Sequence, residues 1–313
     1  MGKLRVALIA GGWSREREVS LKSGESVYNN LDRDKYEVNR YDPREDLIEL
    51  IRDSKNIDIA LIFLHGRKGE DGSMQGLLDI LDLPYVGSDV LASALAMNKA
   101  LSKKLFQQGG LNVPRGISVF KDQNINTDAI VSSLGKTVVV KPLDEGSSVG
   151  LQICSEKMEI DKAIKSAFTF SSEAIVEEYI KGREVSCAVL GNRDPEALPV
   201  IEIIPKKKYG FFSYTAKYVP GASEEICPAQ LPKNIYSKIQ DYAVEAHCLL
   251  GCRNFSRTDM IVNAQDVYVL ETNTIPGMTE TSLFPLAART AGMSFSELLD
   301  RLIELALDNL DMQ

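Results

Sequence analysis

Features that define several special protein classes are scarce in this sequence of 313 residues. No run of 18 apolar residues occurs, so we predict neither an export signal nor a membrane span. The five cysteines are an odd number and lack the density of a secreted disulfide framework, which indicates reduced thiols. Neither an internal repeat nor a low-complexity linker is present. We therefore expect a globular protein of the cytoplasm.

Histidine is rare as well, and only His65 and His247 occur. Cys248 and Cys252 lie four residues apart in a helical pattern, a spacing at which two thiolates could share a metal ion. A structural zinc site needs four such ligands, and no second cysteine pair is near them. We therefore interpret both residues as buried cysteines of a helix.

Positive charge is in the minority, with 36 lysine and arginine residues against 44 aspartate and glutamate residues. The net charge of -8 would repel nucleic acid and anionic membrane surfaces, so neither is an expected partner. A phosphate-bearing ligand would need a local cluster of basic side chains.

The length and the order of the predicted elements indicate two or three domains. Strand-like and helix-like segments alternate in the first third, which predicts an α/β domain with a parallel sheet. Paired strands follow Pro114, and a third region begins near Glu184. The main predicted elements are strands at 5–10, 36–42, 57–64, 137–142, 149–154 and 174–176, helices at 18–31, from 74, 98–108, 157–167, 232–250 and 292–309, and a polar loop at 206–225. We place the domains at 1–96, 97–183 and 184–313.

The segment IAGGWSREREVSLKSG sets Gly11 and Gly12 at the end of the first strand, where ligand sites are common. The third glycine of a dinucleotide fingerprint is absent, which argues against a dehydrogenase. A plain tight turn and a ligand site both remain open. Glu16 lies near a helix start, where the helix dipole alone favours a carboxylate, or where the carboxylate binds a substrate ammonium.

The segment FLHGRKGEDGSMQG carries an apolar strand directly into His65, followed by the acidic pair Glu70 and Asp71. A solvated loop with a helix cap would explain these residues. A histidine at the carboxyl end of a strand in an α/β domain nevertheless favours a ligand site.

The segment VVVKPLDEGSSVG places Lys141 at the end of a strand and beside a loop with Gly146, Ser147 and Ser148. It lacks the glycine spacing of a Walker P-loop, and a simple hairpin turn is the alternative. Flexible glycine and serine residues can nevertheless present backbone N–H groups to phosphate oxygens. Together with Lys141, this loop predicts a phosphate-binding lid.

The segment RTDMIVNAQDVYVLETNT is predicted to form a β-hairpin with its turn near Gln265. This pairing sets Asp259 opposite Glu271, with Asn273 and Arg257 on the same face. Three oxygen ligands suit Mg²⁺ better than zinc or copper, and Arg257 can stabilise an oxyanion. A polar outer sheet face is the weaker alternative, because two acids directly across strands repel unless a cation lies between them.

Taken together and in this order, these segments resemble the D-alanine:D-alanine ligase family of ATP-grasp enzymes, from Val6 to about Ala306. The resemblance implies an α/β fold of three domains: an N-terminal Rossmann-like domain and two ATP-grasp subdomains that hold ATP between them. It also implies a homodimer that joins two D-alanine molecules through an acyl phosphate, releasing ADP and phosphate, for peptidoglycan synthesis.

The resemblance also implies roles for individual residues. Glu16 and His65 would bind the first D-alanine, and Ser147 and Tyr218 would hydrogen-bond with Glu16 and hold a loop closed. Ser282 and Leu283 would bind the carboxylate of the second substrate, and Arg257 and the backbone of Gly277 would stabilise the oxyanion. The residues that would bind ATP are Lys99, Lys141, Ser147, Ser148, Glu177, the hinge from Glu178 through Ile180 to Lys181, Glu184 and Lys217. The residues that would bind Mg²⁺ or Mn²⁺ are Asp259, Glu271 and Asn273, and two ions are expected.

Two departures from the family pattern are mild. Asn98 precedes Lys99 where an aspartate is common, and residues 253–256 replace a more glycine-rich stretch. A D-alanine:D-serine or D-alanine:D-lactate ligase remains an alternative, although the AKY pattern at Tyr218 favours the dipeptide. A nucleotide-binding regulator without activity is a further alternative, but it would be expected to lose the metal or oxyanion residues.

Overall fold

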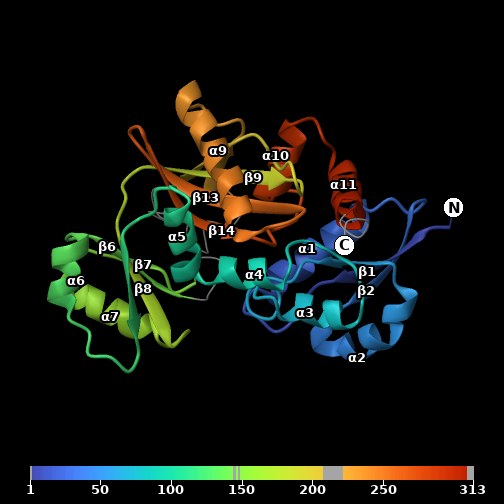
Figure 1. The fold of residues 1–313 in the computed structure, drawn as a ribbon, viewed down its shortest axis with the longest axis horizontal. Coiled ribbons are helices and arrows are strands. Elements are labelled where there is room, and N and C mark those ends of the chain that lie inside the picture. The colour runs from blue at the N-terminus through green and yellow to red at the C-terminus, as the bar shows by residue number, and fades with distance from the viewer. Residues whose placement is uncertain (1, 144–145, 147–148, 207–220, 309–313) are drawn as a thin grey trace.

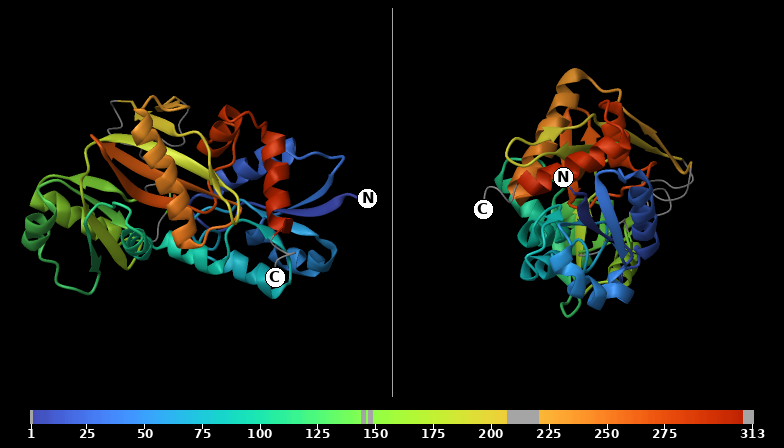
Figure 2. Two further views of the ribbon diagram at one scale, coloured as in Figure 1. Left: turned by 45° about the horizontal axis from the view of Figure 1, so that its top comes forward. Right: turned by 90° about the vertical axis from the view of Figure 1, so that its right-hand side faces the viewer.

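The computed structural model describes residues 2–143, 146, 149–206 and 221–308. Its strands form three separate sheets that follow one another along the molecule (Figure 1). The central sheet lies at one end and the N-terminal sheet at the other, with the six-stranded sheet between them, and a second view keeps this order (Figure 2).

The N-terminal sheet is parallel throughout, which confirms the predicted α/β architecture of this part. Its third strand is buried along its whole length, as expected for a parallel strand that is covered on both faces. The elements are β1 (Leu4–Ile9), α1 (Arg17–Asn30), β2 (Tyr36–Tyr41), α2 (Pro43–Asp53), the 3₁₀ helix η1 (Ser54–Asn56), β3 (Ile59–Ile62), α3 (Ser73–Ile80) and β4 (Tyr85–Val86), in the sheet order β2-β1-β3-β4.

Two short helices, α4 (Val90–Met97) and α5 (Lys99–Gln108), lead from the N-terminal sheet to the rest of the chain. Each begins at a side-chain cap: Asp89 accepts a hydrogen bond from the backbone of Ala92, and Asn98 accepts two from the first turn of α5. The predicted helix at 98–108 is therefore confirmed, and α5 begins at a defined residue.

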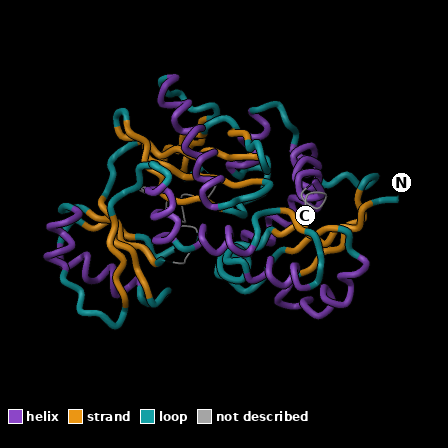
Figure 3. Tube along the Cα trace, in the orientation of Figure 1, coloured by secondary structure: helices purple, strands orange, loops and turns teal. Residues whose placement is uncertain are grey.

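The central sheet is antiparallel and has the order β5-β8-β6-β7. Its helices lie on the outer side of the strands (Figure 3), and a capping box of Glu156 and Glu159 begins the second helix. The predicted strand at 149–154 is too long, because Val149 and Gly150 lie in a turn. The elements are β5 (Gly116–Phe120), α6 (Thr127–Leu134), β6 (Val138–Pro142), β7 (Gln152–Cys154), α7 (Lys157–Ala167) and β8 (Glu173–Glu178).

The six-stranded sheet is antiparallel, with the order β12-β11-β9-β13-β14 and with β10 paired to β9. The predicted polar loop at 206–225 is wrong at its end, because β12 begins at Ser223 and hydrogen-bonds to β11. The elements are β9 (Arg183–Leu190), β10 (Glu196–Ala197), β11 (Ile201–Pro205), β12 (Ser223–Ile226), α9 (Lys233–Leu250), β13 (Phe255–Asn263) and β14 (Asp266–Asn273).

The last helices are α10 (Leu283–Thr290), which the sequence analysis did not predict, and α11 (Phe295–Asp308), which was predicted at 292–309. Helix α11 returns to the N-terminal sheet and packs against α1 and β4 (Figure 1). No helix in the described part of the chain is long and apolar enough to cross a membrane.

The interpretation of the two neighbouring cysteines as buried helix residues is wrong in part. Cys248 is on α9 but is exposed, whereas Cys252 is buried but follows the end of α9. The helix ends at Gly251, which has a left-handed backbone, so the periodicity that joined the two cysteines does not continue.

Candidate active site

The acidic residues predicted to bind a metal lie on the hairpin of β13 and β14. Asp259 lies directly opposite Glu271, so the predicted pairing is confirmed. The strands reach this register through a β-bulge next to Asp259, where Leu270 is the extra residue. Without the bulge, a regular ladder from the turn at 264–265 would pair Asp259 with Leu270 and direct Glu271 to the other face.

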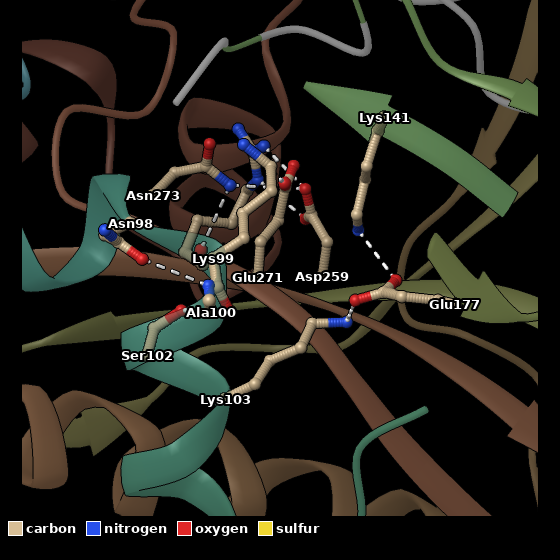
Figure 4. Close-up of polar contacts among 11 residues, drawn as sticks. Asn98, Lys99, Ala100, Ser102, Lys103, Lys141, Glu177, Asp259, Glu271 and Asn273 are labelled. Atoms are coloured by element: carbon tan, nitrogen blue, oxygen red, sulfur yellow. Dashed lines mark hydrogen bonds and ion pairs between the residues drawn. The ribbon is translucent and has the colours of Figure 1, made fainter. Parts of the chain in front are cut away.

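Three polar side chains hold Asp259, which is only 4% exposed. The Ser186 hydroxyl donates a hydrogen bond to Asp259 Oδ1 at 2.6 Å, and the Arg257 guanidinium donates two at 3.0 and 2.9 Å. The Asn273 amide donates another at 3.3 Å. The side chains of Asp259, Glu271 and Asn273 consequently gather on one side of the hairpin (Figure 4).

The donor set of this cluster fits a hard divalent cation. Two carboxylates and a side-chain amide supply oxygen ligands of the kind that Mg²⁺ and Mn²⁺ prefer. Two acids paired across strands also repel one another unless positive charge lies near them. The described residues contain no group of three or more histidine, cysteine, aspartate and glutamate side chains that could hold a metal. A third side-chain oxygen ligand at this site would therefore come from Asn273.

Lys99 is the first residue of α5 and points toward the acid pair (Figure 4). Its Nζ lies 4.0 Å from Glu271 Oε2, and its side chain is 8% exposed. Burial lowers the pKa of Lys99, and the charge of Glu271 offsets only part of this effect. Asn98 fixes the start of the helix by accepting hydrogen bonds from Ala100 and Leu101, at 3.2 and 3.0 Å.

Glu177 at the end of β8 lies between two lysines (Figure 4). Its Oε2 is 3.0 Å from Lys141 Nζ, and its Oε1 forms an ion pair with Lys103 of α5. Burial alone would raise the pKa of Glu177, but the two ammonium groups hold it below its ordinary value. Burial disfavours the charge of Lys141 too, yet Glu177 and Glu271 raise its pKa above the ordinary value.

A cavity between the central sheet and the β13–β14 hairpin brings these residues together. The described residues predicted to bind the nucleotide line it, apart from Lys181 of the hinge, beside two of the predicted metal ligands and several apolar side chains. These are Lys99, Lys141, Glu177, Glu178, Ile180 and Glu184, with Asp259 and Glu271, and the apolar residues Val139, Leu151, Ile153, Ile261 and Leu270.

Glu16 is buried at the start of α1 and is enclosed by two glycine loops. A Cβ atom on Gly146 would lie 2.6 Å from Glu16 Oε2, and one on Gly66 would lie 3.0 Å from the same atom. A larger residue at Gly146 would therefore collide with Glu16. The predicted partner of Glu16 in the EGSSVG loop, Ser147, lies outside the described residues, but Gly146 of the same loop lies beside Glu16.

Glu70 lies beside Glu16 in a smaller hollow that it shares with Lys99, Gly146 and Glu271. The Glu70 carboxylate accepts a hydrogen bond from the Gly66 backbone at 2.7 Å. Burial and the charge of Glu16 raise the pKa of Glu70 to about 8. Glu70 was noticed in the sequence but was not assigned a role.

His65 connects the N-terminal sheet with the segment that follows β14. Its Nε2 lies 3.4 Å from the Ser23 hydroxyl, which accepts a hydrogen bond from the Met278 backbone at 3.3 Å. Burial and the positive charge of Arg257 lower the pKa of His65 to about 4, although a hydrogen bond with the Ile275 backbone opposes this effect. His65 is therefore a neutral side chain at neutral pH.

The sequence matches known proteins over nearly its whole length. A family model described as "D-ala D-ala ligase C-terminus" matches residues 105–304, and "D-ala D-ala ligase N-terminus" matches residues 5–48 and 42–88. A D-alanine–D-alanine ligase from Syntrophobacter fumaroxidans is 54% identical over 307 residues, which are 98% of this chain and 99% of the relative. The chain belongs to the D-alanine–D-alanine ligase family.

Solved structures of the family have the same fold. The D-alanine–D-alanine ligase of Bacillus anthracis complexed with ATP has a TM-score of 0.87 and 34% identity, covering 99% of each chain. A D-Ala:D-Ser ligase from Enterococcus faecalis has a TM-score of 0.81 and 33% identity, covering 97% of this chain and all of the other. The predicted ATP-grasp fold is therefore confirmed.

The residues that the family resemblance assigned to the second substrate lie around the start of α10. The Ser282 hydroxyl accepts a hydrogen bond from the Thr279 backbone at 3.0 Å, and a Cβ atom on Gly277 would lie 3.1 Å from Ser282 Oγ. The Leu283 side chain is buried, so only its backbone remains for ligand binding. Leu283 is the first residue of α10, and the first backbone N–H groups of a helix have no hydrogen-bond acceptor within the helix. The helix dipole also favours an anion at this end.

Four predicted residues, Ser147, Ser148, Lys217 and Tyr218, lie outside the described residues. The other predicted site residues are described. All but Lys181 lie at the nucleotide cavity, near the smaller hollow of Glu70 or around the segment after β14, whereas Lys181 lines a separate pocket with Arg183 and Val262. Sequence analysis missed Lys103. Its position four residues after Lys99 places both lysines on one face of a helix, and this spacing could have indicated it.

Proposed function

We propose that this protein joins two D-alanine molecules to D-alanyl-D-alanine while ATP is converted to ADP and phosphate. The observation that carries the proposal is the cavity that Lys99 and Lys141 line together with the acid pair Asp259 and Glu271. This charge arrangement suits the binding of a triphosphate and the transfer of its terminal phosphoryl group. The names of the family relatives support the same reaction.

The adenine ring and the triphosphate of ATP would bind to different residues of the cavity. The apolar side chains Ile180, Ile261 and Leu270 would contact the adenine ring, and the ammonium groups of Lys99 and Lys141 would bind phosphate oxygens. Glu177 would accept a hydrogen bond at the adenine side, and Glu184 and the hinge from Glu178 to Lys181 would bind the remainder of the nucleoside. The ATP complex of the B. anthracis relative supports ATP as the nucleotide.

Asp259, Glu271 and Asn273 would hold Mg²⁺ or Mn²⁺, and we expect two ions. When bound, such ions neutralise charge on the phosphoryl group that is transferred. The hydrogen bonds from Ser186 and Arg257 keep Asp259 oriented toward the hollow of the site. These bonds would pre-organise the carboxylate for ligation.

The first D-alanine would bind near Glu16, whose buried carboxylate suits an ammonium group. The neutral state of His65 would avoid repelling that ammonium. The second D-alanine would place its carboxylate at Ser282 and at the free backbone N–H at the start of α10. Arg257 and the Gly277 backbone would lie near the reacting carbonyl.

In the proposed reaction, a carboxylate oxygen of the first D-alanine attacks the γ-phosphorus of ATP, and the bond to ADP breaks. The resulting acyl phosphate is attacked by the amine of the second D-alanine. Arg257 and the Gly277 N–H stabilise the tetrahedral oxyanion, and phosphate leaves as the amide forms. Lys217, Ser147 and Tyr218 would complete the site. No protein side chain forms a covalent bond in this sequence.

A D-alanine:D-serine ligase is the second candidate, because the E. faecalis enzyme of that name has the same fold. The difference between the two substrates is one hydroxyl group, which a few side chains around the second site would decide.

We propose domains at 1–96, 97–183 and 184–313 and a homodimer. Ile80 and Leu91 of the N-terminal part are 82% and 67% exposed, which is compatible with a contact between subunits. Because the reaction consumes ATP, we place the enzyme in the cytoplasm.

The test is phosphate release from ATP and Mg²⁺ with D-alanine, L-alanine, D-serine and D-lactate, each alone and paired with D-alanine, with products identified by mass. D-alanyl-D-alanine in equal amount to phosphate would establish the proposed activity. D-alanyl-D-serine as the main product from the pair of D-alanine and D-serine would favour the second candidate, and no turnover with any pair would contradict both.

The metal assignment predicts that Asp259→Asn lowers kcat on the order of 100-fold or more, because a buried anionic ligand is lost. Asp266→Asn is the matched control, since Asp266 is an exposed residue of the same hairpin. Both variants would be assayed over a range of Mg²⁺ concentrations. Equal activity of the two variants would exclude Asp259 as a ligand.

A further inference from the structure

Lys103 is a buried charge whose side chain is directed at Glu177 (Figure 4). It is 5% exposed and lies one helical turn after Lys99 on α5. Lys99, Lys141 and Glu177 all line the nucleotide cavity, but Lys103 does not. Its contact with the cavity therefore runs through Glu177, with which it forms an ion pair (Figure 4).

The two lysines bind different oxygens of Glu177. Lys103 contacts Oε1 from α5, whereas Lys141 contacts Oε2 from the neighbouring strand β6 (Figure 4). Glu177 is only 2% exposed, and a buried carboxylate is costly unless it is paired and hydrogen-bonded. Two cations on one carboxylate give the group of Lys103, Glu177 and Lys141 a net charge of +1, which favours a phosphate ligand at Lys141.

Removal of Lys103 would change this balance. In the described part of the chain, the remaining ion pair of Glu177 would be the one with Lys141. Lys141, which lies 3.0 Å from Glu177, would then neutralise this acid without the help of Lys103, and the local net charge would fall by one. Both effects would reduce the ability of Lys141 to bind phosphate oxygens.

We propose that Lys103 is a positioning residue for the nucleotide: it binds one oxygen of Glu177 from behind the cavity wall and thereby leaves Lys141 available to the phosphates of ATP. This inference rests on the proposed nucleotide site. It assigns Lys103 an effect on ATP binding without any contact between Lys103 and ATP.

The first variant is Lys103→Met, which retains much of the side-chain volume but removes the charge. We expect the KM for ATP to rise about tenfold or more, with kcat and the KM for D-alanine changed less than about twofold. Lys104→Met is the matched control, because Lys104 is the next residue of the same helix and is exposed. An unchanged KM for ATP in folded K103M would overturn the proposal.

A second comparison asks whether Lys103 acts through Glu177. In a Glu177→Gln background the carboxylate that both lysines contact is absent, so adding K103M should raise the KM for ATP less than about twofold. A full tenfold effect in that background would refute the proposed route. The comparison of E177Q with K103M/E177Q also tests the idea if K103M alone does not fold, because the double variant has no unpaired buried acid.

Lys141→Met separates this inference from the proposed nucleotide site. If K141M leaves the KM for ATP unchanged, the site itself is misplaced and both proposals fail. If K141M raises the KM for ATP and K103M does not, only the role of Lys103 is refuted. Calorimetric titration of each variant with ADP gives a second readout, in which the K103M and K141M proteins should both bind more weakly.

Discussion

His247 is a buried side chain at a distance from the active-site hollows. It is 1% exposed, and its Nδ1 lies 2.8 Å from the Ser256 hydroxyl. Burial lowers the pKa of His247 to about 4, as it does for His65. Above pH 6.5 the imidazoles are neutral in both the folded and the unfolded chain. As the pH falls from 6.5 to 4, the unfolded chain takes up protons that the folded chain does not, so stability is lost.

We predict that His247→Gln reduces this acid sensitivity. Glutamine can keep a hydrogen bond to Ser256 but does not titrate, so the slope of the unfolding free energy between pH 6.5 and 4 should fall by up to about 1.4 kcal/mol per pH unit. Urea unfolding of both proteins at several pH values in this window measures the slope. An identical slope would mean that His247 is protonated in the folded protein.

Among the elements, α5 depends on its first residues for both stability and function. Asn98 caps the helix, and Lys99 and Lys103 on the following turns contact Glu271 and Glu177. This arrangement explains why asparagine can stand where an aspartate is common in the family. Both side chains have an oxygen that accepts hydrogen bonds from the first turn, so either can cap the helix.

We predict that Asn98→Ala lowers the free energy of unfolding by about 1 kcal/mol, whereas Asn98→Asp leaves it nearly unchanged. The alanine variant should also raise the KM for ATP, because the start of the helix that carries Lys99 becomes frayed. Urea unfolding and steady-state kinetics measure the two effects. If Asn98→Asp is as harmful as Asn98→Ala, capping is not the function of Asn98.

On the scale of the whole molecule, the described residues form three apolar cores. These cores are not made of three consecutive parts of the chain. One core joins β1 and β3 to α10 and α11, so the first and last parts of the chain are packed together. The central sheet has its own core with α6 and α7. Arg15 of the N-terminal part lies 4.6 Å from the centre of the Phe170 ring, which adds a contact between these two bodies.

Asn254 connects the N-terminal sheet to the six-stranded sheet. Its side chain accepts a hydrogen bond from the Gly87 backbone at 2.6 Å and donates one to Asn192 at 3.1 Å. Its φ is +59°, a region that favours glycine and tolerates asparagine. Asn254 can therefore adopt a backbone conformation that favours glycine, and its side chain links the two sheets.

We predict that Asn254→Ala destabilises the protein by about 2 to 3 kcal/mol, because it removes these bonds and puts alanine at a positive φ. Asn254→Gly should cost about 1 kcal/mol less, since glycine adopts this backbone freely. The difference between the two variants in urea unfolding isolates the backbone contribution. Equal stability of the two variants would contradict the assignment.

In the active site, the sequence predicted one pairing of residues correctly and missed another contact. The pairing of Asp259 with Glu271 was predicted from a turn centred on Gln265, whereas the turn is centred between Ala264 and Gln265. The bulge at Leu270 supplies the missing residue. A bulge depends on the packing of both strands, and the sequence pattern gives no direct signal of it. Lys103 was missed for a similar reason, since helical spacing shows a shared face but not the partner.

The amino-acid sequence by itself determined the parallel N-terminal sheet, the major helices and the family, because periodic apolar residues, caps and ordered motifs are local signals. Only the tertiary structure decided that Glu177 lies between Lys103 and Lys141, and that Glu16 lies between the loops of Gly66 and Gly146. These contacts join segments far apart in the chain, and their geometry follows from the packing of the three sheets. The charges and the burial that set the pKa values of the site arise from that packing.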